Sequence, residues 1–224
     1  MFIGHYAASF VAKKAAPKIS LGLYFVAAQV LDILFSVFLL LGIEKMHLVP
    51  GFTETNDYDL YYLPFTHSLV GALGWAVASA LAIFFALKLR KEAIAFGAVV
   101  FSHFVFDVPV HTPDLPIFGE DSMKIGFGLW RHWYLATALE LVLLALGLAI
   151  YLKFMKPIMN ADPKRKTQIA AFSALLVLLT IATPFLPQPT TSAMFAVQAL
   201  FGYAVLAWLA WRVDRPLSKT EVKT

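Results

Sequence analysis

SLVGALGWAVASALAIFFALKLRKEAIAFGAVVFSHFVFDVPV, residues 68–110, consists of two apolar runs joined by a very short basic link around Lys88–Glu92. Each run has about the length needed to cross the hydrocarbon core of a bilayer as a helix, which takes about 20 residues. The second run also carries a histidine and an aspartate, His103 and Asp107. The stretch therefore predicts two consecutive transmembrane helices, one of which buries ionisable side chains.

The rest of the chain has the same apolar character. Of its 224 residues 60% are hydrophobic and 14% charged, with a mean hydropathy of +0.73, whereas soluble domains are about 45–50% apolar. The long apolar runs are Leu21–Ile43, Ser68–Leu87, Ala93–Val110, Trp133–Met155, Ile169–Leu186 and Ala193–Trp211. We expect an all-α, polytopic membrane protein with about six transmembrane helices in a single membrane domain, residues 1–224.

The N-terminal segment Met1–Ala16 is apolar but short. A bilayer span takes about 20 residues, and the lysines Lys13 and Lys14 follow the apolar stretch instead of preceding it as they would in a signal peptide. We therefore expect this segment to stay in the mature protein as a short interfacial or re-entrant helix.

Lysine and arginine residues alternate between the connections in a consistent sense. One set of connections and ends holds Lys13, Lys14, Lys18, Lys88, Arg90, Lys91, Lys153, Lys156, Lys164, Arg165, Lys166, Arg212, Arg215, Lys219 and Lys223, and the other holds Lys45, Lys124 and Arg131. Cytoplasmic loops carry the positive excess. The pattern predicts an inner (plasma) membrane protein with both termini cytoplasmic. The two long connections, residues 44–66 and 111–132, are then outside and are candidates for binding loops.

Composition excludes some classes of function. The net charge is +4 and the pI about 9.2, but the basic residues are spread over several short loops, which argues against a nucleic-acid-binding surface. The chain has no cysteine, so a metal site has to use nitrogen and oxygen ligands.

Among the ionisable side chains within or beside the apolar segments, five form a group: His5, Asp32, His67, His103 and Asp107. Each costs about 2.5–3.5 kcal/mol to insert into a membrane, so each needs a partner or a function. His103 and Asp107 are four residues apart and project from one helix face. At about 1.5 Å per residue, Asp32, His103 and Asp107 all lie about 18–24 Å from the basic ends of their helices. The group predicts a metal or proton site.

Other polar residues surround this group in the sequence. Ser68, His111, Asp114 and Glu140 are candidates for orienting the five or for binding a substrate. For Glu140, a structural ion pair or a neutral carboxyl is an equal alternative. His47 and His132 fit interfacial hydrogen-bonding groups and are not assigned to the site.

Two motifs resemble the bacterial membrane-bound metal-dependent hydrolases, the LexA-regulated inner-membrane hydrolase group. FTHSLVGAL at Phe65–Leu73 and FSHFVFD at Phe101–Asp107 are similar to the THS and SHxxxD signatures of that family. GHYAAS at Gly4–Ser9 and VLDIL at Val30–Leu34 follow the order of its N-terminal histidine and its Pro-Asp-x-Asp element. The family's extra histidine ahead of THS is absent, and the aspartate pair is reduced to Asp32. Residues 1–114 carry the motifs, and residues 115–224 are expected to be a helical scaffold.

The resemblance implies a membrane-embedded metal-dependent hydrolase. His5, Asp32, His67, His103 and Asp107 would be the metal ligands, with Asp32 or Asp107 alternatively the general base. Imidazole and carboxylate ligands without thiolate suit zinc, with manganese or iron as alternatives. A site below the outer surface predicts a small amphipathic or lipid-like ester or phosphoester as substrate.

Two other classes of function fit the same residues. Buried histidines and aspartates also form ion pathways in proton- or ion-coupled transporters and channel subunits. Such folds often contain internal repeats, and the only echo here is Phe65–His67 against Phe101–His103. In a non-catalytic membrane scaffold the polar residues would only pair with one another.

Overall fold

The computed structural model describes residues 3–214, and the predicted basic residues Arg215, Lys219 and Lys223 lie outside this range. The helices are α1 (Tyr6–Ala15), α2 (Leu21–Ala28), α3 (Val30–Leu40), α4 (Leu69–Leu87), α5 (Arg90–Val110), α6 (Trp133–Ala161), α7 (Pro163–Ala182) and α8 (Ser192–Asp214), with 3₁₀ turns η1 (Ile3–His5), η2 (Leu129–Arg131) and η3 (Thr183–Phe185). Two antiparallel hairpins pair β1 (Lys45–Leu48) with β2 (Tyr58–Tyr62) and β3 (Leu115–Pro116) with β4 (Lys124–Ile125).

The long helices have the length and composition of membrane spans. Five of them, α4 to α8, are long and apolar enough to cross a bilayer, and α2 with α3 makes a sixth if this bent pair is counted as one span. Large apolar side chains such as Leu73, Phe85 and Phe201 remain exposed on their outer faces, as expected for surfaces solvated by lipid. The prediction of an all-α, polytopic membrane fold is confirmed.

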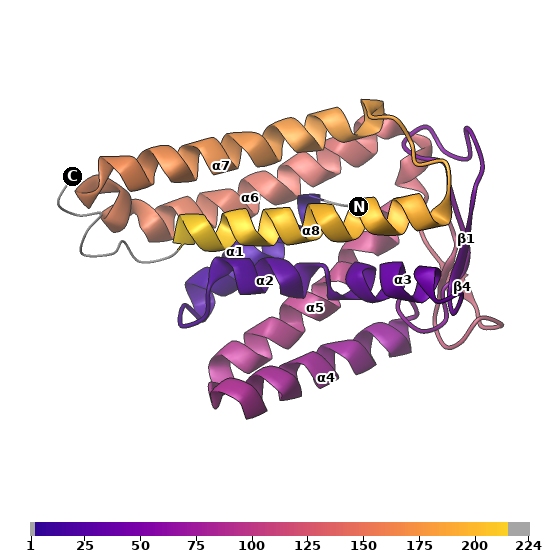
Figure 1. Cartoon of the computed structure of the whole chain (residues 1–224), viewed down its shortest axis with the longest axis horizontal. Coiled ribbons are helices and arrows are strands. Elements are labelled where there is room, and N and C mark those ends of the chain that lie inside the picture. Colours follow the sequence, from indigo (N-terminus) through magenta and orange to yellow (C-terminus); the bar gives the residue numbers. More distant parts are fainter. Residues whose placement is uncertain (1–2, 215–224) are drawn as a thin grey trace.

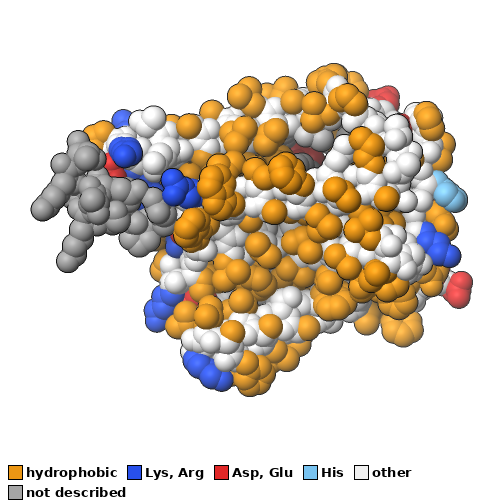
Figure 2. All heavy atoms as spheres, viewed as in Figure 1, with side chains coloured by type: hydrophobic (Ala, Val, Ile, Leu, Met, Phe, Trp, Pro, Cys, Tyr) orange, Lys and Arg blue, Asp and Glu red, His pale blue; other side chains and the backbone are white. Residues whose placement is uncertain are grey.

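The bundle has two chemically different ends (Figure 1). At the end that we call the hairpin end, the β-hairpins connect α3 to α4 and α5 to α6. At the other, which we call the lysine end, the turns between α1 and α2, α4 and α5, and α6 and α7 lie beside the end of α8. Lysines and arginines cluster at the lysine end (Figure 2). The connections that the sequence predicts to be cytoplasmic therefore share one end of the molecule.

Helix α1 lies inside the bundle. Ile3, Tyr6 and Phe10 are fully buried, and the ring of Tyr6 stacks on Phe25 of α2 at 4.0 Å between centroids. A side chain at Gly147 of α6 would lie 2.7 Å from the α1 backbone, so glycine permits this close helix crossing. The opposite face of α1, with Val11, Lys14 and Ala15, is exposed, and both the interfacial and the re-entrant placement stay predictions.

The predicted span Leu21–Ile43 is broken in the structure. α2 ends at Ala28, α3 begins at Val30, and their axes are bent by 54°. Gln29 at the junction has φ −115° and ψ 10°, outside the helical range. Continuous apolar character does not report such a break, because both halves are equally hydrophobic. The break places the Ala28 carbonyl next to α5.

Helix α5 carries the buried pair from the second apolar run. α4 ends at Lys88 in the left-handed conformation (φ +57°), and the chain reverses directly into α5. His103 and Asp107 are each 1% exposed. Pro109 is accommodated in the last turn, and the helix ends before His111.

Candidate metal centre

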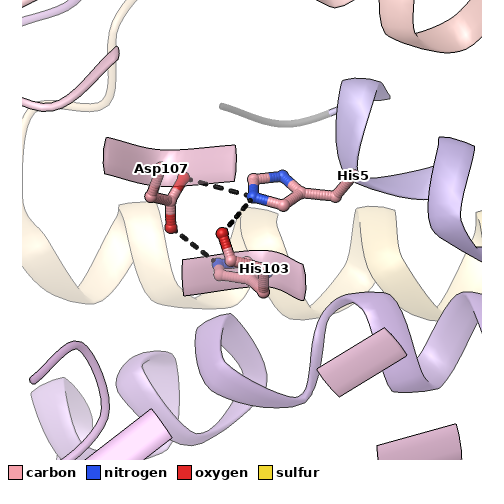
Figure 3. A group of neighbouring side chains, drawn as sticks. All are labelled: His5, His103 and Asp107. Carbon is pink, nitrogen blue, oxygen red and sulfur yellow. Dashed lines mark hydrogen bonds and ion pairs between the residues drawn. The ribbon is translucent and has the colours of Figure 1, made fainter. Parts of the chain in front are cut away.

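The structure brings the five predicted ionisable residues together in the interior of the bundle. Two groups have ligand atoms close enough to share one metal ion: His5, His103 and Asp107, and Asp32, His67 and His103. They come from η1, α3, the start of α4 and α5. Figure 3 shows the first group, in which His5 and His103 each contact the carboxylate of Asp107.

The orientation of His103 is fixed by the break between α2 and α3. Its Nδ1–H donates to the Ala28 carbonyl at 2.7 Å, so in the neutral imidazole the lone pair is on Nε2. Nε2 lies 3.1 Å from Oδ2 of Asp107 and 3.4 Å from Oδ1 of Asp32. This buried nitrogen makes no hydrogen bond to the part of the chain that the structure describes. A buried lone pair facing two carboxylate oxygens suits a metal ligand.

His67 is oriented by a chain of hydrogen bonds from the hairpin end. The Thr66 hydroxyl donates to Oε2 of Glu44 at 2.6 Å, so its oxygen accepts from Nδ1–H of His67 at 2.8 Å. Glu44 also accepts the backbone N–H groups of Phe65 and Thr66 at 2.9 Å. Nε2 of His67 then presents its lone pair 3.3 Å from Oδ1 of Asp32. This carboxylate, hydroxyl and imidazole arrangement is typical of metal-binding histidines.

The two oxygens of Asp32 have different neighbours. Tyr203 of α8 donates its hydroxyl to Oδ2 at 2.9 Å, while Oδ1 faces Nε2 of both His67 and His103. A carboxylate held through one oxygen offers the other in a defined direction. Asp32 therefore has the geometry of a monodentate ligand.

Asp107 lies between two pairs of histidines. Its Oδ2 faces His103 and, at 3.9 Å, His67. Its Oδ1 is 3.2 Å from Nε2 of His5 and 3.7 Å from Nε2 of His111. Nε2 of His5 also lies 3.2 Å from the His103 carbonyl, an acceptor, so in this arrangement it carries the proton and donates (Figure 3). His5 is thus placed to orient Asp107.

The distances fit a small metal ion. Four ligands about 2.0–2.1 Å from a tetrahedral zinc lie about 3.3–3.4 Å from one another. In the group Asp32, His67 and His103, Oδ1 of Asp32 lies 3.4 Å from His103 Nε2 and 3.3 Å from His67 Nε2. Without a metal ion, the histidines would have to be protonated to pair with the two buried carboxylates. The donor set therefore fits zinc.

The other predicted residues occupy varied places. His111 donates Nδ1–H to Asp114 at 2.8 Å and its Nε2 faces the cluster. Glu140 accepts the backbone N–H of Gly4 at 3.1 Å. Ser68 caps α4, accepting from the Gly71 N–H and donating to the Pro64 carbonyl. The two histidines that the sequence analysis leaves out, His47 and His132, are exposed at the hairpin end.

A cavity of about 310 Å³ adjoins the cluster. Asp32, His67 and Asp107 line its inner wall. Tyr58 of β2 lines it nearer the hairpin end, and burial together with the nearby Asp57 and Asp32 raises the pKa of Tyr58 to about 12. The Tyr58 hydroxyl is therefore a hydrogen-bond donor at neutral pH. The cluster is accessible to a small molecule from this cavity.

Sequence reasoning missed Glu44, Thr66 and Tyr203. Glu44 begins the connection 44–66, which the sequence predicts to lie outside, although its side chain is only 1% exposed. Thr66 directly precedes His67 in the THS motif, and this position could have indicated a hydrogen bond to His67. Tyr203 lies in an apolar run of α8 far from the motifs, and nothing in its neighbourhood distinguishes it from an anchoring aromatic residue.

Comparison with models of protein families, with curated proteins and with solved structures finds no match for this chain.

Proposed function

We propose that the protein is a membrane-embedded, metal-dependent hydrolase. The observation that supports this most is the convergence of two imidazole Nε2 atoms, both fixed through their Nδ1 atoms, on one oxygen of Asp32. His67, His103 and Asp32 would be the ligands. Two histidines and one carboxylate with an open fourth position form a frequent catalytic zinc set. The motif resemblance to membrane-bound metal-dependent hydrolases supports the same class.

Zinc is the proposed ion, because the donors are imidazole and carboxylate and the ligand spacing is short. Zinc with an open coordination position lowers the pKa of bound water to about 7 and polarises a carbonyl or phosphoryl oxygen. The substrate is an amphipathic ester or phosphoester, which water splits into an acid and an alcohol.

Asp107 is the proposed general base. Its Oδ2 lies beside the proposed ligands and it lines the cavity, while His5 holds its Oδ1. Oδ2 would accept the proton of the attacking water, a role that contributes about 10²–10⁴-fold to a rate. Asp32 is less suited to this role, because Tyr203 occupies its second oxygen.

Elemental analysis of the purified full-length protein tests the proposal. We expect stoichiometric zinc in the wild type and in Asp107→Asn, and loss of zinc in Asp32→Asn. Hydrolysis of 4-nitrophenyl palmitate and of bis(4-nitrophenyl) phosphate should be lost in both variants. A wild-type protein that contains no transition metal and binds none at neutral pH would contradict the proposal. Proton flux in vesicles without bound metal would identify a transporter, and neither property would indicate a scaffold.

We also propose that the lysine end faces the cytoplasm of a cell with an inner membrane, with the hairpin end outside. Because the native chain has no cysteine, single introduced cysteines report sidedness directly. Lys88→Cys and Lys164→Cys should react only from the cytoplasmic side, and Asp121→Cys only from the other. Labelling of position 164 from outside alone would reverse the orientation.

A further inference from the structure

The cavity beside the cluster is amphipathic. Its inner wall holds Asp32, His67 and Asp107, whereas apolar side chains such as Phe35, Leu63 and Phe195 form other parts of the wall. No lysine or arginine lines it within residues 3–214. Ligand pockets usually measure about 300–1,000 Å³, so at about 310 Å³ this one accommodates a reacting linkage and part of one chain. The remainder of a larger molecule would have to stay outside.

The exposed part of the cavity lining lies on the link that follows α7 and on the first turns of α8. Its exposed lining residues are Leu186 and Pro187, in the link between these helices, and Gln198 of α8. Figure 2 shows a hollow between α7 and α8 in which acidic side-chain atoms are visible. Both helices are candidate membrane spans. At about 1.5 Å per residue, Gln198 lies about 9 Å along α8 from its first residue and Gly202 about 15 Å. The part of the opening that α8 forms therefore lies within this candidate span.

Gly202 keeps the opening wide. It lines the cavity, and a Cβ atom added there would meet nothing within 4 Å. The next residue, Tyr203, donates its hydroxyl to the proposed ligand Asp32. Gly202 at the opening therefore directly precedes a residue that contacts the proposed metal centre. A larger side chain at Gly202 would narrow the passage without a backbone clash.

We propose that the substrate is a membrane lipid that enters sideways from the bilayer between α7 and α8. Part of one acyl chain occupies the apolar part of the cavity, and the linkage next to the headgroup reaches Asp32 and His67. This inference rests on the proposed hydrolase function for its chemistry. Lateral access follows from the position of the opening, and lipid is the apolar, chain-bearing molecule that surrounds α7 and α8.

Photocrosslinking tests the route without requiring activity. The full-length protein is reconstituted in phosphatidylcholine vesicles that contain a phosphatidylcholine with a diazirine in one acyl chain, and crosslinked residues are mapped by mass spectrometry. We expect crosslinks at Phe35 and Leu63, which are 3% and 1% exposed, as well as on the outer face of α4. Gly202→Trp should lose the crosslinks at Phe35 and Leu63 only.

Gly74→Trp is the matched control. Gly74 is exposed on α4, and a Cβ there also meets nothing within 4 Å, so both sets of crosslinks should remain. Gly202→Leu replaces Gly202→Trp if the larger variant does not fold. Absence of crosslinks at Phe35 and Leu63 in the wild type, or their persistence in the folded Gly202 variants, would overturn the proposal. Zinc content, measured on the same samples, tests the hydrolase function separately.

Discussion

Two buried ionic clusters occupy opposite ends of the bundle, and their hydrogen bonding differs. At the lysine end, Nζ of Lys13 contacts Oδ2 of Asp214 at 2.8 Å and donates to the carbonyls of Pro17 and Ile19 at 2.9 Å. Oδ2 of Asp214 also accepts the Leu21 N–H. The ammonium thus uses its three donors. This cluster fastens the ends of α1, α2 and α8 together.

The cluster near the hairpin end, around Asp32 and Asp107, has the opposite arrangement of donors and acceptors. The Nδ1–H donors of His103 and His67 are directed outward, to the Ala28 carbonyl and Thr66, and their Nε2 atoms face inward toward Asp32. It also borders the cavity of about 310 Å³, which neither Lys13 nor Asp214 lines. Buried charge alone therefore does not identify a functional site. What distinguishes the two clusters is whether each charge is satisfied by local backbone or presents lone pairs to a shared point.

His103→Ala should have the largest effect on the inward-facing cluster. It removes a nitrogen that faces both Asp32 and Asp107, so we expect complete loss of bound zinc. Elemental analysis of the purified variant measures this. His47→Ala is the matched control, because His47 is an exposed histidine that pairs with Asp59 away from the cluster, and it should keep its zinc. Equal zinc in both variants would exclude His103 as a ligand.

Lys13→Met should act on stability and leave the site intact. Removing one partner of a buried ion pair typically costs about 3–5 kcal/mol, because the other charge is left unpaired. We expect that loss in the free energy of unfolding, measured by denaturant titration in detergent, with unchanged zinc per folded chain. Lys13→Met combined with Asp214→Leu should recover part of the stability. Loss of zinc from the folded single variant would mean that the two clusters are coupled.

Thr66→Val should produce the smallest of the three effects. It removes the hydroxyl between Glu44 and His67 while keeping the side-chain shape. Loss of a residue that orients a metal-binding histidine lowers metal affinity by about 10–100-fold, which competition with a zinc chelator measures. Thr66→Ser retains the hydroxyl and should restore affinity. If valine and serine variants bind zinc equally, the hydroxyl does not orient His67.

The sequence by itself determined the fold class and the candidates. Long apolar runs have one stable arrangement in lipid, because every backbone polar group has to be satisfied within the segment. The candidate spans α4 to α8 coincide with the predicted runs, although α6 ends later and α7 begins earlier than predicted. His103 and Asp107 are four residues apart, and in a regular helix this spacing places both side chains on one face. Asp32 and His67 could be identified as candidate site residues because burying an ionisable group in a membrane costs free energy and therefore requires a partner or a function.

Only the tertiary structure decided how these residues act together. The 54° bend at Gln29 presents the Ala28 carbonyl to His103, and apolar composition carries no signal of such a bend. Glu44 is buried beside Thr66 by contacts between residues 22 positions apart. Tyr203 reaches Asp32 across 171 positions. Hydrogen bonds of this kind depend on which helix faces meet, and the packing of the whole bundle sets that arrangement.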